Sequence, residues 1–167
     1  MIGTYTREKQ HATRWTCVMK VGKACSRKPV IAGADIDIIE AARLMRKHHV
    51  GTLIIIEDRD GVSAPVGIIT DRDLVVEVLP RDMNLHRIKL GEVMTGSPLI
   101  AREEDDLYDT LEKMWLKGVR RVPVVDAVNN LIGVLSTDDV LEVLARELSG
   151  VIKLFERERG SEELFRV

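Results

Sequence analysis

Two short stretches of the chain place a hydroxyl group near a carboxylate at the same spacing. Gly67–Leu74 has the sequence GIITDRDL, and Gly133–Val140 has the sequence GVLSTDDV. The acid follows the hydroxyl by three positions, as Thr70 and Asp73 in the first stretch and Ser136 and Asp139 in the second. Two strand-forming aliphatic residues precede each hydroxyl, and the hydroxyl–acid spacing fits the first turn of a helix. Each stretch is therefore predicted to be a corner at which a buried strand meets a helix.

Such a corner has two chemical interpretations. In a capping box the hydroxyl accepts a backbone N–H of the helix and the acid reaches back, and a single copy would favour this common arrangement. Aspartate is shorter than the Glu or Gln that capping boxes prefer, so its carboxylate can instead point away from the helix. Two oxygens beside the free N–H groups of a helix N-terminus can grip a diol, while the helix end attracts an anion. A ribose phosphate carries both groups.

Composition limits the class of protein. The 167 residues are 45% hydrophobic and 31% charged, which suits one globular domain with a real core. A net charge of −2 gives no general reason to expect nucleic acid or an anionic membrane as partner. No apolar run approaches the length of a spanning helix and the N-terminus has no signal-peptide core, so we expect a cytoplasmic protein. Two cysteines and four histidines lack the spacing of a disulfide framework or a metal site.

The chain contains an internal duplication. An offset of 69 residues (98 − 29) aligns Pro29-Val30 with Pro98-Leu99, Cys25-Ser26 with Met94-Thr95, Met45 with Met114, and Val50 with Val119. At the corners the offset becomes 66 (133 − 67), because the first copy has a longer turn between its last two strands. Surface turns accept such insertions at little cost, so this register indicates true repeats. Cys25, which aligns with Met94, is expected to be a small buried hydrophobe.

Each repeat is predicted to be a β-α-β-β-α unit. In the first copy the expected elements are an extended entry at Val30–Ala32, a helix capped by Asp35 or Asp37 with its apolar positions at Ile38, Ala41, Ala42, Met45 and His49, strands at Leu53–Ile56 and Val66–Ile69 around an acidic turn at Asp58–Pro65, and a helix to Leu79. In the second they are a helix carrying Leu107, Leu111, Met114 and Trp115, strands at Val122–Val125 and Leu131–Leu135, and a helix from near Ser136.

The fold class that follows is α/β (α+β), with two repeats packed face to face about a pseudo-two-fold axis, because a three-stranded unit cannot cover its sheet alone. The expected division is an N-terminal arm at 1–18, repeats at 19–79 and 90–148, a linker at 80–89 and a C-terminal helical extension at 149–167. The extension carries an apolar stripe at Leu141, Leu144, Leu148, Val151, Ile152 and Phe155. This stripe can pack on its own core or on a second chain, and the sequence leaves both open.

These repeats resemble a known family. The corner pattern, together with the sequence RVPVVD at Arg121–Asp126, is similar to the cystathionine-β-synthase (CBS) domain, and two copies in tandem resemble a Bateman module. The resemblance covers nearly the whole chain. It implies a regulatory module without catalytic activity or cofactor, which binds AMP, ADP, ATP or S-adenosylmethionine in clefts between its repeats. It also implies a homodimer of such modules and an effector protein that senses occupancy.

The resemblance also assigns site residues. It implies that Thr70 and Asp73 contact ribose in one cleft, and that Ser136 and Asp139 do so in the other. The residues implied for the adenine pocket are Pro29, Val30, Val50, Gly51, Pro98 and Leu99. The implied phosphate ligands are Arg120 and Arg121. Their counterparts in the first repeat are Gly51 and Thr52, so a second phosphate site is in doubt.

Other functions are weaker on the sequence. A ligand-independent interaction scaffold is the main alternative. A nucleotide hydrolase is disfavoured, because no Walker loop and no nucleophile paired with a base stands at catalytic spacing. Asp58, Asp60 and Gly61 are expected to form a hairpin turn rather than a calcium loop. The acidic run Glu103–Asp106 is expected to serve a helix N-terminus rather than magnesium.

Overall fold

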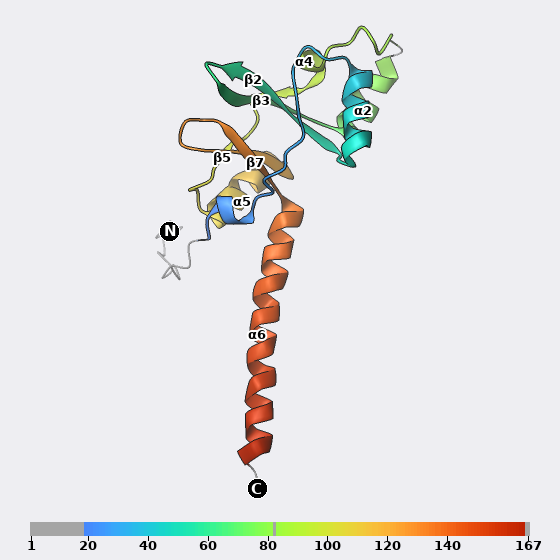
Figure 1. The fold of residues 1–167 in the computed structure, drawn as a ribbon. Helices are drawn as coiled ribbons and strands as arrows, with labels where there is room; N and C mark the ends of the chain where they lie inside the picture. The colour runs from blue at the N-terminus through green and yellow to red at the C-terminus, as the bar shows by residue number, and fades with distance from the viewer. Residues whose placement is uncertain (1–18, 82, 166–167) are drawn as a thin grey trace, which may run out of the picture.

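The computed structural model describes residues 19–81 and 83–165, so the expected N-terminal arm lies outside the described residues. Figure 1 shows two lobes, each with a small sheet and flanking helices, and a long helix that projects from the second lobe. The first set of elements is α1 Val21–Ala24, β1 Ile31–Ala32, α2 Ile38–His48, β2 Thr52–Arg59, β3 Val62–Thr70, α3 Asp71–Asp73, the π-helix Leu74–Val78 and the 3-10 helix Leu79–Arg81. The second set is α4 Leu90–Val93, β4 Thr95–Gly96, β5 Ala101–Arg102, α5 Leu107–Lys117, β6 Arg121–Val125, β7 Leu131–Ser136 and α6 Thr137–Phe165.

The two sheets have matching topology. In the first the strand order is β1-β2-β3-β4, and in the second it is β5-β6-β7. Each begins with a parallel pair joined across a helix, β1 with β2 and β5 with β6, and continues into an antiparallel hairpin. This is the predicted mixed architecture of two β-α-β-β-α repeats, and it is confirmed.

The opening segment of each repeat packs on the other half of the molecule. Ser26 bridges to Val134 in β7, while Thr95 pairs with Ile68 in β3. The exchange continues into the cores, where Val21 and Cys25 join the second cluster and Leu90 joins the first. These partners are equivalent under the offsets of 69 and 66, so the two-fold relation predicted from the sequence exists in space. The halves are interlocked rather than only stacked.

The end of the predicted linker at 80–89 packs against the first half of the molecule. Ile88 at its end is 3% exposed and belongs to the first core. The next residue, Lys89, forms a bridge with Asp37, the residue that caps α2. The last part of the linker is therefore structural.

The helices follow the predicted apolar pattern only in part. Asp37 caps α2 by accepting the Glu40 N–H at 2.8 Å, and Ile38, Ala41 and Met45 are buried as expected. Two assigned apolar positions are wrong, because Ala42 is exposed and His49 ends the helix in the left-handed conformation at φ 54°. In α5, Gly118 ends the helix in the same way at φ 65°. Trp115, which was predicted among the apolar positions of that helix, is 78% exposed, since it lies on the outer face of α5.

The first hairpin is longer than predicted. Arg59 pairs with Val62, so the turn consists of Asp60 and Gly61, both with positive φ. Two left-handed residues match the twist of the flanking strands, which favours a tight hairpin. The expected loop at Asp58–Pro65 is therefore wrong in extent, because the three additional residues lengthen the strands. The predicted hairpin at this place is confirmed.

Candidate functional site

Both corners form capping boxes. At the first, the N–H and Oγ1 of Thr70 donate to Oδ2 of Asp73, each at 2.8 Å, and the Asp73 N–H donates to Thr70 Oγ1 at 3.3 Å. At the second, the N–H and Oγ of Ser136 donate to Oδ2 of Asp139 at 2.8 and 2.5 Å, and the Asp139 N–H donates back at 3.1 Å. The interpretation in which the carboxylates point away from the helices is therefore wrong. Aspartate is long enough to close the box because its own helix turn brings it back to the hydroxyl.

The capping boxes still leave carboxylate oxygens available. Within the part of the chain that the structure describes, every hydrogen bond to Asp73 or Asp139 uses Oδ2. An ionised carboxylate oxygen can accept two hydrogen bonds, so Oδ1 of Asp73, which lines a hollow, can receive two hydroxyl groups. The hydroxyl residues fix the orientation of the acids.

The glycine of each corner motif allows a close crossing of the exchanged segments. A Cβ placed on Gly133 would lie 2.6 Å from the backbone oxygen of Ser26, and one placed on Gly67 would collide with the side chain of Met94. Only a residue without a side chain lets these segments lie directly on β7 and β3 just before the corners. The glycines thereby bring Ser26 and Thr95 next to the corner strands.

The first cleft consists of two adjoining hollows beside the first corner. One, of about 340 Å³, is lined by Ile68, Thr70, Asp71, Arg72, Asp73, Thr95, Gly118, Val119, Arg120 and Arg121. The other, of about 440 Å³, is lined by Ile68, Thr95, Ser97, Pro98, Leu99, Ile100, Lys117, Val119 and Arg121. They share Ile68, Thr95, Val119 and Arg121. The cleft thus brings together the predicted ribose pair, the predicted arginine pair and the predicted Pro98 and Leu99.

The charge in the first cleft suits an anion. Four of its lining side chains are cationic, namely Arg72, Lys117, Arg120 and Arg121, and two are acidic, namely Asp71 and Asp73. Arg120 is exposed, and its side chain forms no ion pair with a described residue. A guanidinium without a carboxylate partner is free to form a two-pronged contact with phosphate.

The second cleft is a smaller hollow of about 260 Å³ on the equivalent side of the pseudo-symmetric pair. Its lining residues are Ser26, Lys28, Pro29, Val30, His49, Val50, Gly51, Thr52, Ile54, Arg121 and Val134. The predicted Pro29, Val30, Val50 and Gly51 therefore lie together. The predicted ribose residues Ser136 and Asp139 are not among the lining residues, and Ser136 is only 9% exposed.

Comparison with known proteins assigns the family. A family model described as the CBS domain matches residues 21–80 and again residues 90–146. The chain belongs to the CBS domain family. An uncharacterised protein of Methanopyrus kandleri is 34% identical over 138 residues, which cover 80% of this chain and 68% of that protein. Hypoxic response protein 1 of Mycobacterium tuberculosis is 28% identical over 123 residues, which cover 74% and 79% of the two chains.

A solved structure gives the ligand chemistry of a relative. The CBS domain pair of protein MJ0100, in complex with 5′-methylthioadenosine and S-adenosyl-L-methionine, matches with a TM-score of 0.65 and 27% identity. The match covers 75% of this chain and 99% of that one. A related CBS pair thus holds two adenosine derivatives.

The position of Arg121 in this CBS pair differs from the one predicted from the sequence. It lines both clefts, whereas Thr52, its counterpart in the first repeat, lines only the second. The additional reach belongs to the longer side chain, whose guanidinium lies 4.0 Å from the carboxylate of Asp138 beside the second corner. Arg120 thus lines the first cleft alone, whereas Arg121 lines both clefts, although the sequence predicted both arginines on one side. Alignment of the two repeats could not predict that the Arg121 side chain extends to the second cleft.

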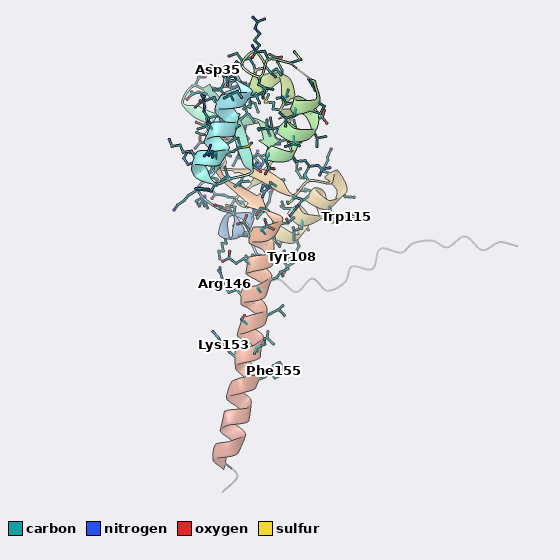
Figure 2. The ribbon with its side chains drawn as sticks, turned by 90° about the vertical axis from the view of Figure 1, so that its right-hand side faces the viewer. Asp35, Tyr108, Trp115, Arg146, Lys153 and Phe155 are labelled. Carbon is teal, nitrogen blue, oxygen red and sulfur yellow. The ribbon has the colours of Figure 1, made fainter. Side chains whose placement is uncertain are left out.

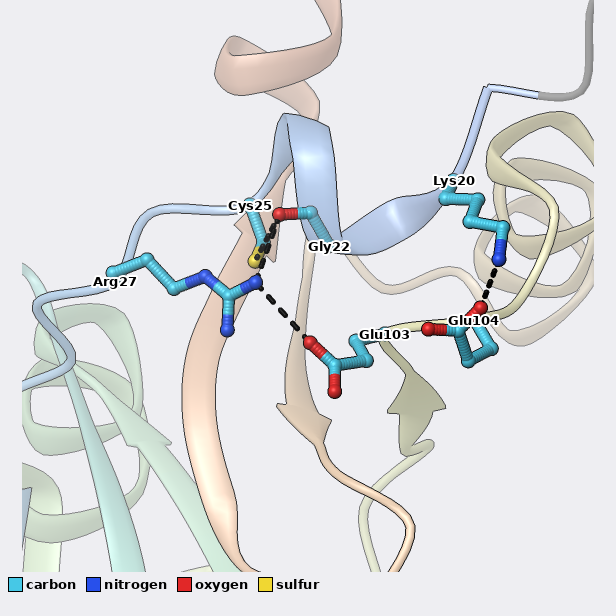
Figure 3. Close-up of polar contacts among 6 residues, drawn as sticks. All are labelled: Lys20, Gly22, Cys25, Arg27, Glu103 and Glu104. Carbon is cyan, nitrogen blue, oxygen red and sulfur yellow. Dashed lines mark hydrogen bonds and ion pairs between the residues drawn. The ribbon is translucent and has the colours of Figure 1, made fainter.

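The acidic run of this CBS pair has a structural role. Figure 3 shows Glu103 and Glu104 facing the opening segment, where Arg27 Nη2 lies 3.2 Å from Glu103 Oε2 and Lys20 pairs with Glu104. Asp106 caps α5 by accepting the N–H groups of Tyr108 and Asp109. Asp106 starts the helix, as expected from the sequence, whereas Glu103 and Glu104 pair with the opening segment, which the sequence did not predict.

The described residues hold no group of acidic, cysteine or histidine side chains arranged to bind a metal ion. A search of the same residues for a helix long and apolar enough to cross a membrane finds none.

Proposed function

We propose that this CBS pair is a regulatory module that binds an adenosine-containing ligand in the first cleft and signals occupancy to a partner protein. The observation that carries the proposal is the meeting of Asp73 with Arg120 and Arg121 on one hollow. A carboxylate with a free oxygen can accept the two ribose hydroxyls, and the guanidinium groups can hold a phosphate. One molecule that satisfies both is a nucleoside phosphate.

The adjoining hollow supports adenine binding. Its apolar residues Ile68, Pro98, Leu99 and Val119 lie next to the ribose and phosphate side chains. The two hollows, about 340 and 440 Å³, have sizes usual for small-molecule sites. An aromatic base placed there would bury its faces against aliphatic side chains.

The energetics require all three contacts. Each charge-assisted hydrogen bond from ribose to Asp73 contributes roughly 1.5–3 kcal/mol when sheltered from water. Micromolar affinity corresponds to about 8.2 kcal/mol, so the ribose contacts alone are insufficient. Arginine on phosphate and burial of the base supply the remainder. AMP, ADP and ATP fit this division of contacts best, while S-adenosylmethionine would use the ribose and adenine contacts only.

The described thiol, Cys25, does not have the surroundings of a catalytic nucleophile. Cys25 is buried in the second core, and burial raises the pKa of its thiol above the usual value. An activated nucleophile needs the opposite, a lowered pKa in an accessible cationic site. The proposed signal is a change in how this module meets an effector protein.

A ligand-independent scaffold is the second candidate. It is favoured by the large apolar side chains left in solvent on α5, including Trp115 and Leu116. Such patches commonly mark interaction surfaces. Partner binding that no nucleotide alters would select this function.

Isothermal titration calorimetry of the full chain tests the proposal. AMP, ATP, S-adenosylmethionine and 5′-methylthioadenosine are titrated into the wild type, into Asp73→Asn, and into Asp58→Asn as a control on the remote hairpin. We expect micromolar binding of at least one phosphate-bearing ligand, weakened by Asp73→Asn and unchanged by Asp58→Asn. Absence of heat with all four ligands would reject the proposal.

A further inference from the structure

The C-terminal helix α6 leaves the body of the protein after its first turns. Val140 is buried in the second core and Val143 packs against it, so the start of the helix is fixed. Figure 1 shows the remainder extending away from both lobes. A helix with no tertiary contact is only marginally stable in water, because most helical stability in proteins comes from packing of an apolar face. The projecting part of α6 therefore calls for a partner.

The apolar side chains of this segment have coiled-coil spacing. The exposed positions alternate in steps of three and four, at Leu141, Leu144, Leu148, Val151 and Phe155. This is the a/d pattern of a heptad repeat with a period of 3.5 residues. Such a narrow seam is filled by the side chains of another helix, which supercoils around the first. A sheet or a flat surface would not match it.

The opposite face of α6 is charged. Arg146 forms an ion pair with Glu142 at 3.1 Å, and Figure 2 shows Arg146 and Lys153 on one side of the helix with Phe155 on the other. Tyr108 and Trp115 of α5, 54% and 78% exposed, lie on the same side as Phe155 in this view. In this view the exposed aromatic side chains of α5 and the seam residue Phe155 therefore face the same side of the molecule.

The seam is large enough to hold a stable dimer. Its residues are between 38% and 65% exposed, which leaves on the order of 100 Å² of each side chain uncovered. Five seam residues together with Ile152 present roughly 600 Å² per helix. Two copies would bury about 1,200 Å², the lower limit of standard stable interfaces, before any contribution from α5.

We propose that α6 forms a parallel, in-register, two-stranded coiled coil with α6 of a second copy. The parallel direction follows from the side that Phe155 shares with Tyr108 and Trp115, because a parallel pair places both bodies at the same end and turns the Trp115 surfaces toward the partner. An antiparallel pair would leave Tyr108 and Trp115 in solvent. This interface is independent of the nucleotide function proposed above.

Sedimentation analysis of the full chain tests the interface. The wild type is compared with Leu148→Glu, in the seam, and with Lys153→Glu, on the charged face of the same helix. We expect a dimer for the wild type and Lys153→Glu, and at least a 100-fold weaker association for Leu148→Glu. A monomeric wild type, or a Leu148→Glu variant that dimerises as the wild type does, would overturn the proposal.

A cross-link tests the direction and controls for loss of folding. In a Cys17→Ser background, Leu144→Cys places a thiol at a seam position away from the middle of α6, where it meets its own copy only in a parallel coil. Oxidation should give a covalent dimer with Leu144→Cys and none with Lys153→Cys. If Leu144→Cys stays uncrosslinked while the chain is dimeric, the parallel register is wrong, and an antiparallel coil or another interface forms the dimer.

Discussion

The first and second clefts are made from equivalent segments of a duplicated chain, yet they offer a ligand different groups. The first has its corner acid Asp73 and the arginine Arg120, whereas the second lacks its own corner acid and has Gly51 at the position equivalent to Arg120. Among the described lining residues, Arg121 alone borders both clefts. The two halves therefore share their backbone arrangement but differ in the side chains that line the clefts.

The backbone explains why the position of Arg120 was free to diverge. The N–H of Asp71 donates to the oxygen of Gly51 at 3.0 Å, and the N–H of Thr137 donates to the oxygen of Arg120 at the same distance. Both halves thus use only the main-chain carbonyl of this position to hold the corner. Arginine in one copy and glycine in the other both supply this carbonyl, so the side chain of this position can differ between the clefts.

The largest expected effect concerns the glycines at which the opening segment of each repeat crosses the other half of the molecule. Gly133→Ala should destabilise the protein by up to about 3 kcal/mol, because its Cβ would press on the backbone oxygen of Ser26, which cannot move without the exchanged segment. Gly67→Ala should have a smaller effect, since the flexible side chain of Met94 can rotate away. Scanning calorimetry should show a Tm lower by about 5–10 °C for Gly133→Ala. Equal shifts for the two variants would contradict this difference.

The next effect tests the shared arginine. Arg121→Thr, which copies the residue at Thr52, should weaken a phosphate-bearing ligand in both clefts by about 10-fold to 100-fold, because each loses a charge-assisted contact. Arg120→Ala should weaken the first cleft alone, by about 10-fold. Two-site calorimetric titrations with ATP measure both. If Arg121→Thr leaves the weaker site untouched, Arg121 acts in one cleft only.

The smallest of these effects separates the two corner acids. Asp73→Asn should reduce nucleotide affinity by about fivefold to tenfold, since an amide oxygen accepts ribose hydroxyls without the charge. Asp139→Asn, matched in its capping role, should change affinity by less than about twofold, because its side chain does not line the second cleft. The same titration serves for both. Equal losses would show that the clefts use their corners alike.

Much of the fold could be predicted because the sequence pattern is local and occurs twice. The strands before Thr70 and Ser136, the caps and the hairpin follow from residues close in the chain. The crossing of Ser26 onto Val134 could not be predicted, because it joins segments more than a hundred residues apart and its only local sign is the glycine at 133. Spacing alone left open whether the corner acids close capping boxes or point away, and the reach of Arg121 depends on side-chain geometry that spacing does not specify.

Residue-resolved NMR with ¹⁵N-labelled protein and AMP tests the central claim most directly, since it reports where and in what order the clefts respond. We predict that the amides of Thr70–Asp73 and Gly118–Arg121 shift at lower AMP concentration than those of His49–Thr52. Spectra in which neither group of amides shifts at saturating AMP, or in which the second cleft responds first, would contradict the account.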